Sequence, residues 1–274
     1  LGGCAQWNDS GSMSPLEATS VASTTGQSKR VVLEVRFVNT ALDALDPDQT
    51  AGLWQWVDET SIDARQRQRL LENGVRVGLV ANESRFLSRL ESFAVETDVV
   101  EEFLSQASVA SDVSHGDQRI PIRLGRRYEL ALRQPFEGSH VGLVSGDGEI
   151  TGRTLNNAQY FLAFTATAAD SVEQLRLRIR PEIQYGAARP KWVSSDTAIR
   201  IDTRRETWAL DMLSIDVLAA QGDTIVMAPD TPTRGLASKM LIGNGNDQDP
   251  EQLLVLIRVA RIPSPADKLV ARIP

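Results

Sequence analysis

The stretch Leu175-Arg176-Leu177-Arg178-Ile179-Arg180 indicates the fold class more directly than any other part of the chain. Three aliphatic residues alternate with three arginines, and a period of two is typical of a β-strand with one buried face. Pro181 follows and is expected to limit the strand, because proline cannot donate a hydrogen bond to a neighbouring strand. The segment therefore predicts a half-buried strand that carries a ladder of arginines on its outer face.

Similar strand-like runs surround this segment from residue 120 onward. Residues typical of turns, namely Gly, Asp, Asn and Pro, separate them, and many short strands spaced in this way are typical of sandwich or barrel-like domains. We therefore expect residues 119–274 to form a β-rich, mostly antiparallel, sandwich-like domain. The runs are residues 120–124, 127–133, 140–145, 159–167, 174–180, 198–202, 208–218, 223–228 and 252–262.

The preceding part of the chain mixes strand and helix patterns. Residues 31–38 alternate as a half-buried strand, and residues 75–80 read as a second one. Between them, Ser61 is expected to cap a helix that runs to Leu71 and stops at Asn73-Gly74. Two further helices are indicated by the spacing of apolar residues, which are Phe86, Leu87 and Leu90, and then Val99, Val100, Phe103 and Leu104.

These patterns together predict an α+β protein with two folded units. Residues 30–107 are expected to form a small α+β domain, and the polar residues 108–118 a linker to the β-rich domain. Residues 5–29 are rich in Ser, Thr, Gly and Ala, so they are expected to act as a flexible tether.

Cys4, the only cysteine, follows Leu1-Gly2-Gly3. This tetrapeptide resembles a bacterial lipobox, in which the cysteine becomes the lipidated first residue of the mature protein. The resemblance implies a membrane anchor at Cys4 and a place in the bacterial cell envelope, facing the periplasm or in the outer membrane. Ala5 takes the position at which Asp favours retention in the inner membrane, so it favours the outer membrane.

The composition excludes several classes of protein. The net charge of −7 argues against nucleic-acid binding, which normally shows a basic surface. A chain with one cysteine has no internal disulfide and no Cys-rich zinc or redox motif. Its apolar runs are too short to form a membrane-spanning helix.

Three segments in the second half resemble the C-terminal β-domain of bacterial secretins. They are residues 177–183, which contain Pro-Glu-Ile, residues 221–227, and the aliphatic residues 251–257, and their order agrees with that family. Residues 228–250 depart from it, because they lack the Pro-Leu…Pro-x-Leu-Gly signature. The resemblance implies a related β-domain and gives little support to a pore.

A second resemblance lies in the first half. The segments Trp54-Gln55-Trp56-Val57-Asp58-Glu59 and Leu71-Glu72-Asn73-Gly74-Val75-Arg76-Val77-Gly78 are similar to uncharacterised exported proteins of planctomycete-type bacteria. That resemblance implies no known activity.

The sequence shows no catalytic constellation. His115 and His140 are the only histidines, and neither lies in a nucleophile elbow, an HExxH motif or a P-loop. Residues 244–251 alternate oxygen donors that could suit Ca²⁺, but their spacing departs from an EF-hand loop and Pro250 interrupts it. We therefore read this segment as a solvated hairpin loop, and we expect neither a metal nor a cofactor.

Two groups of residues remain as candidate binding sites. Trp54 and Trp56 lie two apart, so in a strand they would share a face that could bind a glycan or a peptide, although core packing is the simpler interpretation. Arg176, Arg178 and Arg180 need acidic partners or water, and could bind an anionic polymer or a partner surface.

The sequence thus predicts a non-enzymatic, lipid-anchored envelope protein that acts in structure, assembly or binding, and the secretin resemblance implies a relationship to secretion-channel components. The membrane is its expected partner through Cys4, together with envelope proteins that the sequence does not identify. The alternative is an envelope hydrolase or a carbohydrate-binding protein.

Overall fold

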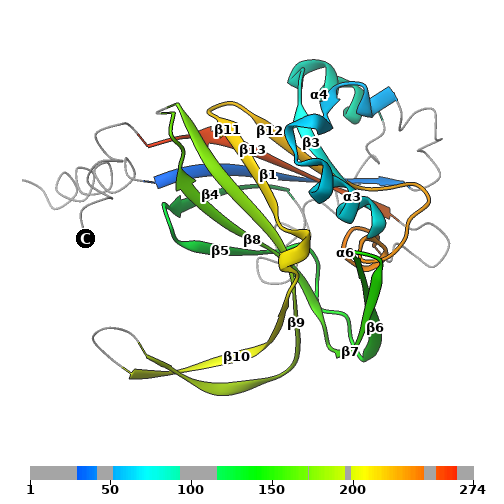
Figure 1. Cartoon of the computed structure of the whole chain (residues 1–274), viewed down its shortest axis with the longest axis vertical. Coiled ribbons are helices and arrows are strands. Elements are labelled where there is room, and N and C mark those ends of the chain that lie inside the picture. Colours follow the sequence, from blue (N-terminus) through cyan, green and yellow to red (C-terminus); the bar gives the residue numbers. More distant parts are fainter. Residues whose placement is uncertain are drawn as a thin grey trace, which may run out of the picture.

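The computed structural model describes residues 30–41, 52–92, 116–171, 173–194, 199–243 and 251–263. The protein is mostly β-structure arranged in several sheets, and every strand pairing among these residues is antiparallel (Figure 1). Most of the strand runs expected from the sequence are confirmed in position.

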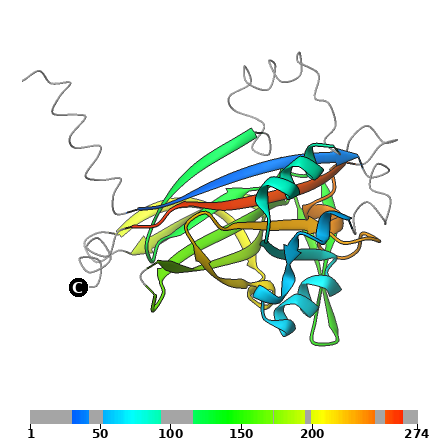
Figure 2. The same cartoon turned by 90° about the horizontal axis from the view of Figure 1, so that it is seen from above.

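A six-stranded sheet combines strands from both ends of the chain in the order β2-β3-β12-β13-β1-β4. Its neighbouring strands β13 and β1, from opposite ends of the chain, lie side by side in both ribbon views (Figures 1 and 2). The strands are β2 (Val57–Asp58), β3 (Val75–Val80), β12 (Thr224–Pro229), β13 (Glu251–Arg261), β1 (Arg30–Ala41) and β4 (Gly116–Arg123).

A second sheet has the order β10-β9-β8-β5, with β11 also paired to β9. The strand β9 is long enough to pair with three other strands, which are β8, β11 and β10. A separate two-stranded hairpin, β6–β7, completes the β-structure. These strands are β5 (Arg127–Ala131), β6 (Ser139–Gly146), β7 (Glu149–Asn156), β8 (Gln159–Ala168), β9 (Gln174–Ser194), β10 (Ile199–Ala209) and β11 (Ile215–Ala220).

The helices are short. They are α3 (Ala64–Glu72), α4 (Glu83–Glu91) and α6 (Ala237–Met240), with 3-10 turns η1 (Glu59–Ser61) and η2 (Asp211–Leu213). The expectation that Ser61 caps the first helix is wrong. Asp63 caps α3 instead, because its carboxylate accepts the backbone N–H groups of Arg65 and Gln66 at 3.0 and 3.2 Å.

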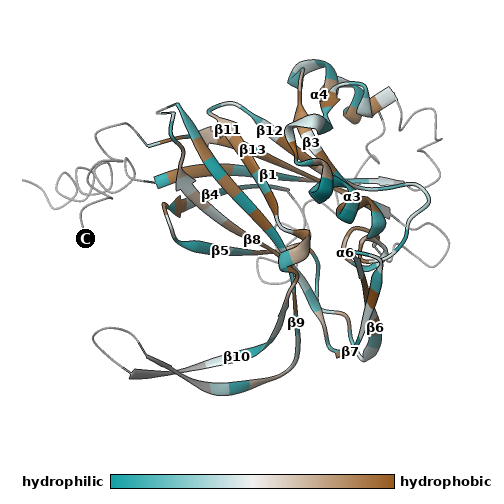
Figure 3. Ribbon diagram, viewed as in Figure 1, coloured by the Kyte–Doolittle hydropathy of each residue, from teal (hydrophilic) through white to brown (hydrophobic). Residues whose placement is uncertain are grey.

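One hydrophobic core joins the two large sheets. Alternate residues of β1, such as Leu33 and Val35, belong to the same buried cluster as Leu177 and Ile179 of β9. Figure 3 shows the alternation as teal and brown bands along strands of the central body. The period of two that the sequence predicted is therefore what gives each sheet its inward apolar face.

A smaller hydrophobic cluster lies on the opposite face of the six-stranded sheet. Phe86 and Leu90 of α4 pack there with Trp54 and with Leu254 of β13. In Figure 2, α4 lies across β1 and β13. The six-stranded sheet is thus covered on both faces at this end, which explains the nearly continuous apolar sequence of β13.

The expected boundary at residues 108–118 does not separate two sheets. β1 pairs with β13 and β4, and β3 pairs with β12, so strands from residues 30–107 are built into a sheet with strands from residues 119–274. A distinct small α+β unit is therefore not evident in the structure. Most of residues 108–118 lie outside the described residues.

Pro181 does not limit the strand as expected, since β9 continues to Ser194. Its neighbour β11 reaches only as far as Ile179, and β10 begins to pair at Glu182. Pro181 lies between them, where its carbonyl accepts the N–H of Leu210 at 3.1 Å. The missing N–H therefore falls in a gap between two neighbouring strands, where no ladder hydrogen bond is lost.

The predicted run 208–218 is divided at the same place. β10 ends at Ala209, the 3-10 turn η2 intervenes, and β11 begins at Ile215. The strand β7 was not predicted, because its sequence Glu149–Asn156 is largely polar and contains a glycine. Among the described residues, no helix is long and apolar enough to cross a membrane.

Asn73 is the residue that ties α3 to the β6–β7 hairpin. Its side chain is fully buried, and its amide donates to the carbonyls of Arg69 and Ser145 at 2.8 and 2.6 Å. Its side-chain oxygen accepts the N–H of Ser145 at 2.8 Å. One side chain thus satisfies backbone groups from two separate elements.

We expect Asn73→Ala to lower the free energy of unfolding by about 1–3 kcal/mol, because it leaves partly buried backbone groups without partners. Urea unfolding followed by circular dichroism measures this. Gln68→Ala is the control, since Gln68 is exposed and its side chain bonds that of Glu72, also on α3, at 3.2 Å; it should change stability by less than about 0.5 kcal/mol. Equal effects of the two substitutions would contradict the role given to Asn73.

Candidate functional site

The proposed anchor Cys4 lies outside the described residues, as do residues 244–250 of the expected hairpin loop. The other candidates from the sequence can be placed. The structure brings the arginine ladder into a charge network, separates the environments of the two tryptophans, and reveals two surfaces that the sequence did not indicate.

The arginine ladder lies on the outer face of β9, as predicted. Arg176 and Arg178 are exposed, and Arg180 is half-buried. Arg178 donates through Nε and a terminal nitrogen to the carboxylate of Asp216 on β11, at 3.0 and 3.1 Å. This hydrogen bond raises the pKa of Arg178 above its usual value.

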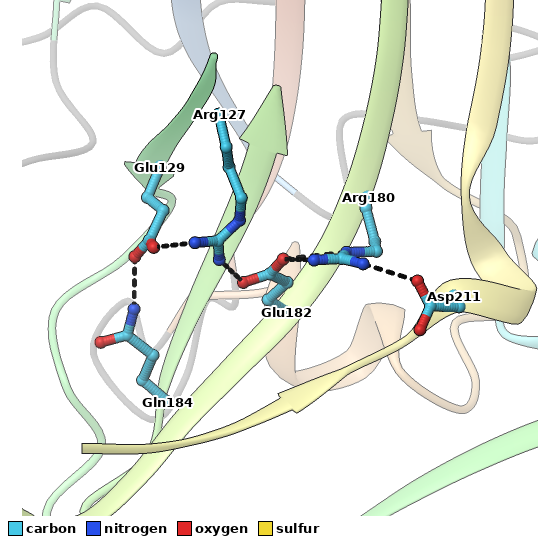
Figure 4. A network of polar contacts seen from close by, with 6 residues as sticks. All are labelled: Arg127, Glu129, Arg180, Glu182, Gln184 and Asp211. Carbon is cyan, nitrogen blue, oxygen red and sulfur yellow. Dashed lines mark hydrogen bonds and ion pairs between the residues drawn. The ribbon is translucent and has the colours of Figure 1, made fainter. Parts of the chain in front are cut away.

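Glu182 is the centre of a larger network next to the ladder (Figure 4). Its side chain is fully buried, although it lies on the outer face of the sheet, because Arg127 and Arg180 cover it and both bond its carboxylate. Arg180 also reaches Asp211 at 2.6 Å. Arg127 also bonds Glu129, which accepts a further hydrogen bond from Gln184 at 2.6 Å.

This network supplies the acidic partners that the sequence required for the ladder. Arg178 and Arg180 each hold at least one carboxylate, so their charges are largely neutralised within the protein. Arg176, which lies in register between Thr167 and Leu218, is exposed at the end of the row. The ladder is therefore better suited to stabilising the sheet than to binding an anionic polymer.

Trp54 and Trp56 do not share the face of a strand, because the chain turns between them. Trp54 belongs to a helical turn and is only 8% exposed, with the guanidinium of Arg76 4.2 Å from its ring centre. Trp56 is half-buried, and Arg85 lies 5.0 Å from its ring centre. Trp54 therefore serves the packing of the outer cluster, and Trp56 alone is open to a ligand.

Trp56 lines an open groove of ≈ 570 Å³ along α4. The other lining residues are polar: Gln55, Ser84, Arg85, Ser88, Arg89 and Ser92. An aromatic ring beside hydroxyl and guanidinium groups can in chemical terms hold a sugar ring. This groove is the surface that remains for the glycan-binding interpretation.

His140 forms an aromatic cluster with Phe136 and Tyr160, rather than a catalytic pair with Ser139. Its Nε2 lies 2.9 Å from the hydroxyl of Tyr160, and the ring of Phe136 is centred 5.3 Å away. Burial and the nearby charge of Lys239 lower the pKa of His140. Burial also raises the pKa of Tyr160 to about 12, so both groups are neutral near pH 7.

Within the part of the chain that the structure describes, no group of three or more Asp, Glu, His or Cys is placed to hold a metal ion. The richest set of acidic and basic residues outside the Glu182 network lines a groove of ≈ 370 Å³ on the six-stranded sheet. Its charges are mutually paired; for example, Arg36 bonds Asp117 at 2.8 and 2.9 Å. In the same groove the hydroxyl of Thr224 donates to Oε1 of Glu83 at 3.1 Å, and Nε of Arg258 lies 3.6 Å from that carboxylate oxygen.

The first surface that sequence reasoning missed is an arm formed by β9 and β10. β9 pairs with β8 only as far as Gln184, and from Tyr185 to Ser194 it pairs with β10 alone. Figure 1 shows this two-stranded ribbon extending away from the rest of the protein. The length of this arm was not predicted, because the strand was expected to end at Pro181.

The second is the outer face of the β6–β7 hairpin. Val141, Leu143 and Ile150 are 57%, 50% and 71% exposed, which is unusual for large apolar side chains gathered on one small hairpin. The opposite face of the hairpin is anchored, since Arg153 stacks 4.6 Å from the ring centre of Trp208. A free apolar face on a fixed element is suited to contact with another molecule.

Comparison with known proteins gives no further guide, because no family model, no curated protein and no solved structure matches this chain. The resemblances to secretins and to planctomycete exported proteins stay predictions from short motifs. Function has to be inferred from the surfaces described above.

The Glu182 network yields a test of what the ladder does. Glu182→Gln keeps the size of the side chain but removes the charge shared by Arg127 and Arg180, so we expect a loss of about 1.5–3 kcal/mol in the free energy of unfolding. Asp216→Asn breaks a more exposed pair and should cost about 0.2–1 kcal/mol. Chemical denaturation measures the free energy of unfolding of both variants. A loss in Glu182→Gln no larger than that in Asp216→Asn would contradict the central role of Glu182.

The environment of His140 predicts a pH dependence of stability. Its pKa in the folded state lies below the usual 6.5, so as the pH falls below about 6.5 the unfolded chain binds the proton first and folding becomes less favourable. We expect the unfolding free energy to fall between pH 7.5 and 5.5, and to fall less in His140→Gln. Identical slopes in the two proteins, measured by urea unfolding, would rule out this assignment.

Proposed function

We propose that this protein is a non-enzymatic assembly protein of the bacterial cell envelope, anchored by a lipid on Cys4. In this proposal, a β-sandwich-like body displays the β9–β10 arm to a partner protein. The arm is the observation that carries the proposal. The small α+β portion supports the body, because its strands complete the six-stranded sheet.

The shape of the arm favours a role in binding. Beyond Tyr185 the two strands have no third strand on either side among the described residues, and an isolated two-stranded hairpin is at best marginally stable in water. Its open edges carry backbone groups that a partner strand can pair with. Pro190, which is exposed on β9, is the kind of residue that discourages indiscriminate pairing along such an edge.

The charge of the arm indicates the kind of partner. Residues 185–206 contain five basic and three acidic residues, although the whole chain has a net charge of −7. A basic projection on an acidic protein favours an acidic protein surface, and the opposite charge would steer the encounter. The relationship to secretion-channel components remains part of this proposal and is supported by the order of the three motifs on β9, β12 and β13.

Site-specific photo-crosslinking tests the arm. A benzophenone amino acid replaces exposed Ala188 on the arm in one protein, and exposed Asp170 on the body in the control. After irradiation of intact cells, we expect a discrete adduct with an acidic envelope protein from position 188 and none from position 170. Adducts of equal yield from both positions, or from neither, would remove the support for the arm.

A shortened variant separates binding from folding. Replacing residues 187–204 by Asn-Gly, a sequence suited to a two-residue hairpin turn, removes the arm. Of the replaced residues, those whose burial the structure describes (187–190, 203 and 204) belong to neither hydrophobic cluster, so we expect the unfolding transition to remain cooperative. We expect the shortened protein no longer to bind the envelope protein that position 188 cross-links in the full-length chain; if the shortened protein still binds it, the arm is not the binding element.

Mass spectrometry of the N-terminal peptide tests the anchor. We expect diacylglycerol and acyl groups on Cys4, and release of the protein from membranes in Cys4→Ala. Unmodified Cys4 in the mature protein would contradict the anchor and leave the arm proposal standing on its own.

The second candidate is carbohydrate binding at the groove of Trp56, whether in a hydrolase or in a binding protein. The open polar groove beside this ring favours it. Titration with cell-wall oligosaccharides, followed by tryptophan fluorescence, should then show saturation that Trp56→Ala abolishes. Ser61→Ala, outside the groove, is the control. An unchanged titration in Trp56→Ala would exclude this groove.

A further inference from the structure

The backbone of β7 has a free edge whose hydrogen-bonding pattern can be determined. Asp147 and Gly148 both have positive φ, 52° and 83°, which is the signature of a two-residue hairpin turn. In such a turn the residues that flank it, Gly146 and Glu149, exchange backbone hydrogen bonds. The N–H of Asn157 donates to the carbonyl of Gly138 at 2.7 Å, which agrees with this alternation of hydrogen-bonded and non-hydrogen-bonded pairs. The odd-numbered residues of β7 therefore bond β6, and the even-numbered residues direct their backbone groups outward.

This edge is accessible in the part of the chain that the structure describes. β7 pairs there with β6 and with no other strand, and residues 149–154 are all exposed. An exposed strand edge is a template for another strand. The residues that offer their N–H and C=O groups are Ile150, Gly152 and Thr154.

The side chains beside this edge form a self-complementary surface. Ile150 is 71% exposed, and its register partner on its own hairpin is the small Ser145. Gly152 has no side chain, and the side chain of Leu143 leans over it: a Cβ built on Gly152 would lie only 3.2 Å from Cδ2 of Leu143. The hairpin thus carries a projecting isoleucine and, two residues away, a glycine with an apolar neighbour.

We propose that a second copy of this chain binds here, by antiparallel pairing of β7 with β7 around a two-fold axis at Thr151. In this register Ile150 of one copy lies opposite Gly152 of the other, and each such pair exchanges backbone hydrogen bonds from outward-directed residues. Ile150 then contacts Leu143 of the second copy across the glycine. The exposed apolar faces of the two hairpins join into one strip.

The charges match in the same register. Glu149 of one copy lies opposite Arg153 of the other, in a pair without backbone hydrogen bonds, where side chains approach most closely. Arg153 already stacks on Trp208, which holds its guanidinium on the face that also carries Glu149. A shift of the register in either direction breaks the Ile150–Gly152 and Glu149–Arg153 matches together.

The pairing is isologous, so it closes at two copies and does not propagate into a fibre. It is independent of the lipid anchor and of the β9–β10 arm, which leaves the arm free for a different partner.

Cysteine cross-linking tests the register. In a Cys4→Ser background, which contains no other cysteine, Thr151→Cys places two thiols across the two-fold axis, within the range in which a disulfide forms. Thr154→Cys is the matched control: it lies on the same edge, but the two thiols would be about 20 Å apart. We expect rapid oxidation to a covalent dimer from position 151 alone; equal yields from the two positions would overturn the proposed register.

Charge exchange tests the interface in the full-length protein with reductant present. Glu149→Arg and Arg153→Glu each bring like charges together twice in the dimer, so we expect the dissociation constant from sedimentation equilibrium to rise by about tenfold in each. The double variant should recover the affinity of the original protein. Glu173→Arg, at an exposed position on another turn, is the control for net charge.

The outcomes separate the alternatives. Thermal unfolding of each variant shows whether the fold is retained, and the recovery in the double variant distinguishes pairing from damage to the stack on Trp208. A protein that stays monomeric at the highest soluble concentration overturns the proposal. So does a dimer unaffected by these substitutions, or a ring of many copies, because two-fold pairing of β7 cannot build one.

Discussion

The pairing of β1 with both β13 and β4 is the interaction on which the rest of the structure depends. β1 lies inside the six-stranded sheet, so its removal would separate β4 from β13 and expose the core on that side. Because strands distant in sequence must meet before the sheet can form, residues near both ends of the chain are needed for a single core. The parts expected to be separate domains are therefore joined in one sheet.

β9 organises the second sheet in a comparable way. It pairs first with β8 and β11, then with β10, and the change of neighbour takes place at Pro181. The buried carboxylate of Glu182 follows immediately and joins β5, β9 and η2 through two arginines (Figure 4). The same strand thus holds the body together and continues outward as the arm, so the binding element is an extension of a core strand.

The two tryptophans and the arginine ladder show how far the candidate site could be predicted. Alternation correctly placed Arg176, Arg178 and Arg180 on an outer face. The acidic partners of Arg178 and Arg180 come from β11, η2 and β9 itself, and could not be predicted from local spacing. Trp54 and Trp56 were expected to share a face only if they lay in a strand. A turn between them gives each a different environment, because packing under α4 overrides the local pattern.

The sequence by itself determined which side chains of a strand face the core, since a period of two is a local property of the backbone. The turn at Asp147-Gly148 is local in the same sense, because glycine relieves the strain of positive φ at its second position. Only the tertiary structure decided which strands are neighbours, where β9 leaves the sheet and which edge of β7 stays open. Those features depend on contacts between residues far apart in the chain, and the energy of such contacts is not encoded in any one segment.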